Sequence, residues 1–290
     1  MTTHYIIPCS AKKAEPPANG LCWTEDTRIS EWKIAWDQAP QRLPVSSMYT
    51  GRSIIKSLEV IRSSSDDWRV WVVSAGKGLL RGPSSIGDEE DEIPSYDVHC
   101  FPSLPMTPGK MRQLWEGSEG EFYDDSKRNP WSKLDISRGD SVVVSLPISY
   151  QSAILPSLGE YIATAGDVIG IGSHLRNVPR LRSLGSHPRI RETLGCGFSM
   201  MRANLLQRWV SGGDEELERL DAEARALIRV PSRRRVSDEQ LKSIISGAPT
   251  EVKSSISRTV PWVRHGRKIS ASESRIISAL ESSRKNRDEE

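Results

Sequence analysis

The residues best suited to chemistry lie directly after short apolar runs. The first run is followed by Cys9-Ser10-Ala11-Lys12-Lys13, and a later one ends in Ser74-Ala75-Gly76-Lys77-Gly78. Another is followed by Ser145-Leu146-Pro147. Small residues and exposed amides followed by lysines suit the close approach of a phosphate or a sugar, and the nearby Trp23 can stack on a base. A solvated turn would also place lysines here, so both interpretations stay open.

The apolar runs predict the elements that position these residues. Runs rich in β-branched residues lie at 5–8, 69–74, 141–146 and 167–172. Helix-like stretches lie at 53–62, 108–116, 151–163 and 199–210. Continuous apolarity without strict alternation is typical of parallel strands that are covered on both faces. The order predicts a three-layer αβα fold with a central, mostly parallel four-stranded sheet, whose sites lie at the carboxyl ends of its strands.

The composition describes a globular chain of 290 residues with 37% hydrophobic and 27% charged residues, which excludes disordered and collagen-like classes. There is no apolar run of the roughly 18 residues needed to span a bilayer and no charged leader before residue 4, so we expect a cytoplasmic protein without membrane contact. The four cysteines are far apart and form no Cys-x-x-Cys pair, which predicts reduced thiols and no metal site. Gly170-Ile171-Gly172 lacks the full dinucleotide fingerprint, and we expect no cofactor.

The net charge of +2 is unevenly distributed along the chain. Residues 231–287 hold 13 Lys and Arg against 5 Asp and Glu, whereas residues 1–230 hold 27 against 30. This asymmetry predicts a basic appendage that contacts an acidic polymer such as DNA. Because Gly212-Gly213 precede a strongly helical segment, we expect an α/β domain over residues 1–212 and a basic helical extension over residues 213–290, with Arg233, Arg234 and Arg235 near the start of its basic part. A solvated basic helix that only improves solubility is the alternative.

Two segments resemble the uracil-DNA glycosylases. Their first active-site loop reads Gly-Gln-Asp-Pro-Tyr-His, six further residues, then Gly-Leu-Cys-Phe. Here Pro8-Cys9-Ser10-Ala11-Lys12-Lys13 is followed, after six residues, by Gly20-Leu21-Cys22-Trp23. Gly195-Cys196-Gly197-Phe198-Ser199 with Asn204-Leu205-Leu206 resembles the run that opens the last helix of that superfamily.

A second resemblance covers more of the chain. A bacterial and phage family akin to the archaeosine-synthase lyase domain shows Cys-Ser/Gly-x-Lys-Lys, Tyr-Thr, Ser-Ala-x-x-Gly-Leu and Pro-Tyr-Asp in this order. The counterparts here are residues 9–13, Tyr49-Thr50, residues 74–79, and Pro94-Ser95-Tyr96-Asp97 with one extra residue. Together the two resemblances span roughly residues 4–210.

These resemblances imply cleavage of an N-glycosidic bond in a nucleotide that is flipped out of the helix. Such a reaction needs a carboxylate near the sugar, a donor for the leaving base and a pocket in which the base stacks. The implied base and sugar pocket consists of Cys9, Lys12, Lys13, Asn19, Trp23, Ser74, Lys77, Tyr96 and Ser145.

The departures from the glycosylase pattern bear on the substrate. Ser10 stands where those enzymes carry their water-activating Asp, and Lys12 stands where a Tyr excludes thymine, so we expect a base bulkier than uracil. Asp97 is the first candidate for the missing carboxylate, and the acidic run at residues 88–92 is the alternative. The histidine that assists the leaving base is expected at His174 or at His187.

Five arginines, Arg176, Arg180, Arg182, Arg189 and Arg191, lie in the region that corresponds to the DNA-wedging loop of the glycosylases. Arginines on phosphates, with Leu181 or Leu184 as the wedge, would serve this task. An exposed basic loop without a ligand is the alternative.

The sequence thus predicts a DNA glycosylase of the uracil-DNA-glycosylase-like fold that acts as a monomer on double-stranded phage DNA in antiphage defence. The expected substrate is a bulky modified pyrimidine, such as glucosylated hydroxymethylcytosine, and the expected product is an abasic site. A base-exchange or lyase enzyme of deazaguanine metabolism and a catalytically inactive DNA-binding module are the alternatives.

Overall fold

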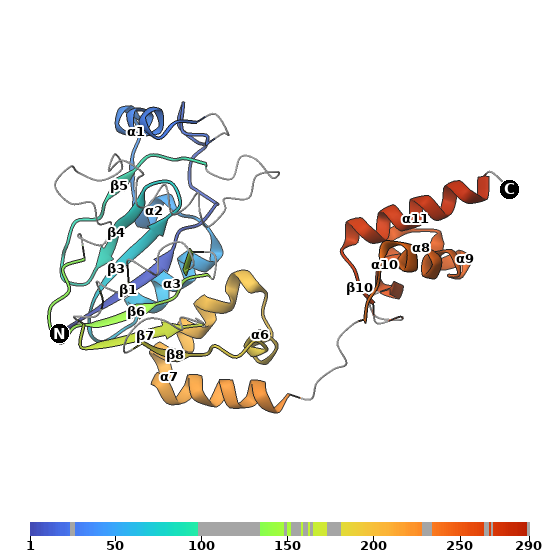
Figure 1. Ribbon diagram of the computed structural model, residues 1–290. Helices are drawn as coiled ribbons and strands as arrows, with labels where there is room; N and C mark the ends of the chain where they lie inside the picture. Colours follow the sequence, from blue (N-terminus) through green and yellow to red (C-terminus); the bar gives the residue numbers. More distant parts are fainter. Residues whose placement is uncertain are drawn as a thin grey trace. The chain divides into compact units, whose positions relative to one another are not determined.

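The computed structural model describes residues 1–23, 27–97, 134–147, 150–151, 158, 162, 165–172, 181–227, 234–263, 267 and 269–288 (Figure 1). The chain divides into two compact units, Met1–Ala226 and Leu227–Glu290. The boundary therefore falls after Ala226 and not after residue 212. The reason is helix α7 (Phe198–Ala226), which is interrupted at Gly213 but continues with Leu217, Leu220 and Ala224 in the core of the first unit.

The first unit is built on a six-stranded sheet with the order β4-β3-β1-β6-β7-β8 (Figure 1). Its strands are β1 (Thr2–Pro8), β3 (Asp67–Ser74), β4 (Gly78–Ser84), β6 (Ser141–Val144), β7 (Asp167–Ile171) and β8 (Leu181–Leu184). All neighbouring pairs are parallel except β3 and β4, which are antiparallel. The predicted α/β class with a mostly parallel sheet is confirmed, and the predicted number of four strands is wrong.

The two additional strands lie at the edges of the sheet. β4 contains two glycines and a proline and no β-branched residue, a composition that is tolerated on an edge strand. β8 reads Leu-Arg-Ser-Leu, and its two central residues are exposed. Neither strand has the continuous apolar pattern of a strand covered on both faces, which is why the pattern alone did not predict them.

Helices α3 (Arg52–Arg62) and α7 cover one face of the sheet. They pack against each other, α3 also contacts β1, and the Trp209 ring of α7 meets the Tyr5 ring of β1 edge-on at 6.3 Å. Ile54, Leu58 and Ile61 form the buried side of α3. This arrangement is consistent with a three-layer α/β fold. The helix expected at 108–116, and most of the one expected at 151–163, lie outside the described residues.

The other described elements of the first unit are short. They are α1 (Ile29–Gln38), β2 (Leu43–Pro44), α2 (Val45–Met48), β5 (Glu92–Ile93), which pairs antiparallel with β2, and α6 (Ile190–Leu194) before α7.

Cys22 is disulfide-bonded, whereas Cys9 and Cys196 are free thiols, so the prediction of reduced thiols is wrong for Cys22. None of the described helices has both the length and the apolarity that crossing a bilayer requires.

The second unit is mainly helical and has its own core. Its elements are β9 (Arg234–Arg235), α8 (Asp238–Ser246), α9 (Thr250–Lys253), α10 (Ile256–Pro261), β10 (Ile269–Ser270) and α11 (Glu273–Asp288). β9 and β10 pair in parallel, and α8 packs on α11. Ser237 and Gln240 form a capping box at the start of α8, which satisfies amide groups that the first turn leaves unpaired. Leu241, Ile245 and Ile276 are buried in this core.

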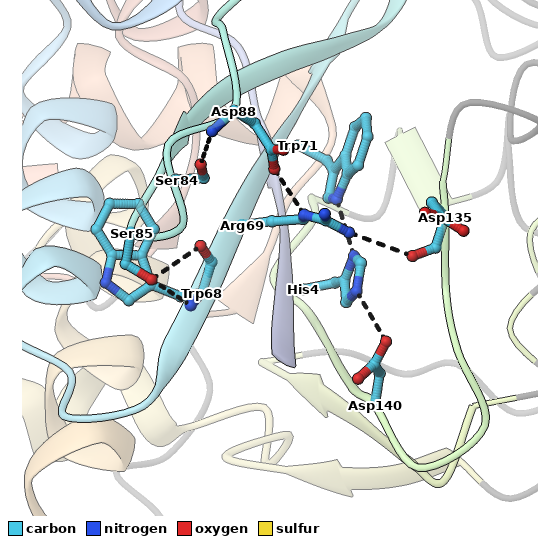
Figure 2. A network of polar contacts seen from close by, with 9 residues as sticks. All are labelled: His4, Trp68, Arg69, Trp71, Ser84, Ser85, Asp88, Asp135 and Asp140. Carbon is cyan, nitrogen blue, oxygen red and sulfur yellow. Dashed lines mark hydrogen bonds and ion pairs between the residues drawn. The ribbon is translucent and has the colours of Figure 1, made fainter. Parts of the chain in front are cut away.

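A buried histidine, His4, joins three strands in the half of the sheet that contains their amino ends (Figure 2). His4 is fully buried; its Nδ1 accepts a hydrogen bond of 3.1 Å from Trp71 Nε1, and its Nε2 lies 3.5 Å from the Asp140 carboxylate. Burial lowers the pKa of His4, although Asp140 opposes this effect. The Asp140 carboxylate in turn accepts hydrogen bonds from the backbone N–H groups of Thr2 and Ser137. A neutral His4 therefore ties β1 to β3 and to the start of β6.

The acidic run at residues 88–92 supports the fold. Asp88 pairs with Arg69 at 2.6 Å (Figure 2). Glu90 accepts hydrogen bonds from the backbone and hydroxyl of Ser46, and Asp91 accepts one from the backbone N–H of Arg81. These three acidic side chains anchor the loop to α2 and to the strands β3 and β4. The structure thus gives the alternative source of a catalytic carboxylate a structural role.

Candidate functional site

The sheet has a topological switch point between β1 and β6. From β1 the chain returns to the sheet at β3, on one side of β1, whereas from β6 it returns at β7, on the opposite side. In open α/β sheets, ligands bind in the crevice outside the carboxyl ends of such strands. Cys9 lies there after β1, and its Sγ is 3.1 Å from the hydroxyl of Tyr150, which comes from the segment after β6.

Backbone contacts hold the loop that follows β1. The Cys9 N–H donates to the Val73 carbonyl of β3, and the Lys13 backbone forms an antiparallel bridge with Tyr49. Further along, Cys22 forms a parallel bridge with Asp97. The four segments that resemble the bacterial and phage family, residues 9–13, 49–50, 74–79 and 94–97, are thereby brought to one end of the sheet, although they are far apart in the sequence.

Three buried hydroxyl groups form a chain at the end of β3. The Tyr96 hydroxyl lies 2.7 Å from that of Tyr49 and 2.5 Å from Ser74 Oγ. Ser74 Oγ also accepts hydrogen bonds from the backbone N–H groups of Gly76 and Lys77. Burial raises the pKa of both tyrosines above the ordinary value for a phenol. Both phenols are therefore neutral at physiological pH and can act as hydrogen-bond donors.

The turn between β3 and β4 requires a glycine because aromatic rings pack directly on it. A Cβ at Gly76 would lie 2.5 Å from Cε2 of Tyr96 and 3.2 Å from Cζ2 of Trp32. Trp32 Nε1 donates a 2.8 Å hydrogen bond to the Gly76 carbonyl. The Trp36 ring lies 5.2 Å from Tyr96, and the half-buried Trp23 ring lies 5.3 Å from Trp32. Trp23 is thus the partly exposed member of an otherwise buried aromatic cluster.

Two lysines lie over the faces of these rings. Lys13 Nζ is 4.1 Å from the centroid of Tyr96, and Lys77 Nζ is 5.3 Å from that of Trp36. The ring face attracts a cation, so both contacts orient the amine. Burial lowers the pKa of Lys13, although the nearby Cys9 and Asp97 favour its charged form. The Lys13 amine and the Asp97 carboxylate therefore lie close enough to influence each other.

Other residues of the predicted pocket have a different environment. Ser10 Oγ accepts a hydrogen bond from the Lys12 N–H and packs so tightly on Gly51 that a Cβ there would lie 1.9 Å from it. Lys12 is exposed, and Ser145 is bound through its backbone N–H to the Ile6 carbonyl. Asn19 is exposed and lines a neighbouring cavity of about 280 Å³. Ser10 is thus a turn residue that packs against Gly51, and its place in the catalytic machinery stays a prediction.

Of the two candidate histidines, His187 lies within the described part of the chain. His174 lies outside the described residues. The His187 N–H donates to the Asp221 carboxylate at 2.9 Å, and its Nδ1 accepts from the Arg189 N–H, so it forms part of the turn before α6. It follows β8, three strands from β1, which corresponds to roughly 14 Å at a strand spacing of about 4.8 Å. The structure does not bring His187 together with Cys9.

The predicted DNA-binding arginines are only partly described. Arg176, Arg180 and Arg233 lie outside the described residues, and of Arg234 and Arg235 only the backbone, in β9, is described. Arg182 pairs with Asp167 and Asp214, and Arg189 pairs with Glu192. Arg191 is different because its guanidinium lies 4.1 Å from the ring of Phe198. Arg182 and Arg189 therefore already have carboxylate partners.

The predicted wedge residues do not project from the sheet edge. Leu184 is buried in β8 and Leu181 is half-buried in the same strand. Leu184 as a wedge is therefore wrong. The exposed apolar side chain of this region is Phe198, at 70% exposure, at the start of α7. Phe198 belongs to the segment that resembles the last helix of the glycosylases.

Several residues of the site were not predicted individually. Tyr49 belongs to the Tyr49-Thr50 motif, so the sequence carries a signal for it. Trp32 and Trp36 belong to no motif and enter the site through the packing of α1. Tyr150 follows β6 closely, a position that favours a site residue in such sheets. The arrangement offers a stacking surface, two amines and a carboxylate beside a buried chain of hydroxyl groups. Comparisons with models of known families, with curated proteins and with solved structures found no match.

Proposed function

We propose that this chain is a DNA glycosylase that hydrolyses the N-glycosidic bond of a bulky modified pyrimidine and leaves an abasic site. The observation that supports it is the meeting of four sequence segments, which include Lys13, Tyr96 and Asp97, at the carboxyl ends of β1 and β3. Trp23 is held beside them by a backbone hydrogen bond to Asp97. These side chains correspond to the needs of the reaction, which are a stacking surface, hydrogen-bond donors and negative charge near the sugar.

Each residue has a role in the proposed reaction. Trp23 stacks on the flipped base through its exposed side, because every base has a π-face that an aromatic ring can cover. Asp97 activates the attacking water and stabilises the oxocarbenium-like transition state with its negative charge. Lys77 binds a phosphate or a hydroxyl group of the substrate. The Asp97 carboxylate favours the charged form of Lys13 and so raises the pKa of this amine, which indicates that the two groups are near each other in the proposed site.

The substrate is proposed to be large because no aromatic ring stands at the position where uracil-DNA glycosylases exclude thymine. Lys12 occupies that position and is exposed. Glucosylated hydroxymethylcytosine in phage DNA is the substrate we favour, and its excision would serve antiphage defence. The second unit is proposed to contact the duplex, since residues 231–287 carry 13 basic against 5 acidic residues. We propose a cytoplasmic monomer that needs no cofactor.

The test compares three DNA substrates. The full chain is incubated with unmodified DNA, uracil-containing DNA and phage DNA with glucosylated hydroxymethylcytosine, and abasic sites and released bases are measured. Abasic sites are expected only from the glucosylated DNA. Replacing Asp97 with Asn should reduce their rate of formation about 10²-fold or more. Asp37→Asn, on the exposed side of α1, is the matched control and should keep the activity.

The other outcomes separate the alternatives. If no DNA yields abasic sites, the glycosylase proposal is wrong, and salt-dependent DNA binding without chemistry then indicates a binding module. Activity on free nucleosides that survives removal of the second unit would instead indicate an enzyme of deazaguanine metabolism.

A further inference from the structure

We propose that Lys13 gives this chain a second activity, in which its amine forms an imine with C1′ of an abasic site and cleaves the strand on the 3′ side. The inference rests on the proposed function, because base excision supplies the abasic sugar at the same pocket. Its own substrate, an abasic site, can also be supplied ready-made, so it can be tested separately.

The first support is the fixed position of the amine. The backbone on both sides of Lys13 is held by hydrogen bonds, from the Thr50 N–H to the Lys12 carbonyl and from the Ala14 N–H to the Met48 carbonyl. The side chain then extends over the Tyr96 ring, with Nζ 4.1 Å from the centroid. Nζ also lies 3.4 Å from the Ala11 carbonyl. The amine therefore has a defined position over the Tyr96 ring, near the carboxyl end of β3.

The second support is the charge state that this position favours. An amine attacks a carbonyl carbon only when it is neutral, and a lysine with an ordinary pKa of about 10.4 is neutral in roughly one molecule in 2,500 at pH 7. Each unit by which the pKa falls increases this fraction about tenfold. Burial lowers the pKa of Lys13 and outweighs the opposing effect of Cys9 and Asp97. The neighbouring Tyr96 and Tyr49 phenols are neutral and add no negative charge. The Tyr96 ring face favours the ammonium form, as Cys9 and Asp97 do, while burial acts in the opposite direction.

The proposed cleavage of the abasic strand needs only water and protons besides the amine and the DNA. The sugar of an abasic site opens to an aldehyde; the neutral amine adds to C1′, one proton is taken up and one water leaves, which gives an iminium ion. A base then removes a proton from C2′, the C3′–O3′ bond breaks, and the 3′ phosphate leaves with the bonding electrons. Water hydrolyses the conjugated iminium, which releases an unsaturated aldehyde and regenerates Lys13.

Asp97 is the group suited to take the C2′ proton. Its carboxylate is the acidic side chain that influences Lys13, and its backbone N–H and carbonyl are hydrogen-bonded to residues 21 and 23 of the loop that follows β1. The same carboxylate can thus assist base excision first and strand cleavage second, while the amine and the carboxylate remain on one rigid loop assembly.

The experiment traps the iminium with borohydride, which reduces it to a stable secondary amine. The full chain is incubated with a duplex oligonucleotide that carries one abasic site, prepared from a uracil-containing strand, and the covalent complex is quantified on a denaturing gel. Lys13→Gln should reduce the complex at least about tenfold, because the nucleophile is removed. Lys33→Gln, on the exposed surface of α1, is the matched control and should trap as well as the parent chain.

Peptide mapping of the complex formed by the parent chain makes the test independent of how well Lys13→Gln folds. An adduct on Lys13 supports the inference, whereas an adduct on Lys12 or Lys77, or no adduct, overturns it. Abasic sites from glucosylated DNA without a trapped complex would leave the glycosylase proposal intact and refute the lyase step. A complex on Lys13 without base release from any DNA would support the amine chemistry and refute the glycosylase proposal.

Discussion

Replacing Tyr96 with Phe tests whether the buried hydroxyl chain holds the candidate site together. The Tyr96 hydroxyl connects the hydroxyl of Tyr49, which is 1% exposed, to Ser74 Oγ at the end of β3. Its ring also packs on Gly76, and phenylalanine preserves that contact. The change therefore removes two hydrogen bonds and leaves the packing almost unaltered.

The expected cost follows from the groups that lose their partner. The Tyr49 hydroxyl is left in a buried place without its bond to Tyr96, and such a group costs about 1–3 kcal/mol. Ser74 Oγ keeps the N–H groups of Gly76 and Lys77 and loses only the bond to Tyr96, worth about 1 kcal/mol. We therefore expect Tyr96→Phe to lower the free energy of unfolding by about 2–4 kcal/mol. Tyr49→Phe, which leaves the Tyr96–Ser74 bond in place, should cost about 1 kcal/mol.

Urea unfolding followed by tryptophan fluorescence measures this difference. Eight of the nine tryptophans lie in the first unit, so the signal reports mainly on the unit that contains the site. Both variants should keep the slope m of the parent chain and differ in the midpoint. A loss below about 0.5 kcal/mol for Tyr96→Phe, or an equal loss for both variants, would refute the assignment of the hydroxyl chain as a stabilising network.

Two further predictions concern the opposite end of the sheet and the second unit. Burial in the fold lowers the pKa of His4 and keeps this residue neutral. The contribution of His4 to the free energy of unfolding is therefore complete above the unfolded-state pKa of about 6.5. It is lost as the pH falls below that value, by up to about 1.4 kcal/mol per pH unit. Urea midpoints at pH 7.5, 6.0 and 5.0 measure this loss of stability. If a His4→Gln variant lost stability just as steeply, the assignment of the loss to His4 would be wrong. Leu241→Ala should cost about 2–5 kcal/mol, because it opens a cavity in the core of the second unit. Hydrogen exchange of the backbone amides should then accelerate in residues 238–288 but not in β1. Lys242→Ala, on the exposed side of α8, is the control and should change neither the free energy of unfolding nor the exchange rates.

How far the sequence predicted the fold depended on how local the signal was. β1, β3, β6 and β7 are continuous apolar runs, and a strand covered on both faces needs no information from elsewhere in the chain. β4 and β8 owe their place to neighbouring strands that supply hydrogen bonds to a short, partly polar segment. The helical pattern after residue 213 likewise predicts a helix but not the unit to which this helix belongs. Its contacts with the core of the first unit decide that.

The same distinction applies to the candidate site. The sequence by itself determined that Cys9, Ser74 and Ser145 lie at or directly after the ends of strands. It also determined that they lie at the same edge of the sheet, because the carboxyl ends of parallel strands meet there. Only the tertiary structure decided that Tyr49 and Tyr96 share a hydrogen bond and that Lys13 lies on an aromatic ring. Those contacts join residues that are 47 and 83 positions apart, and they arise when loops are closed and packed, a process that no local pattern of residues encodes.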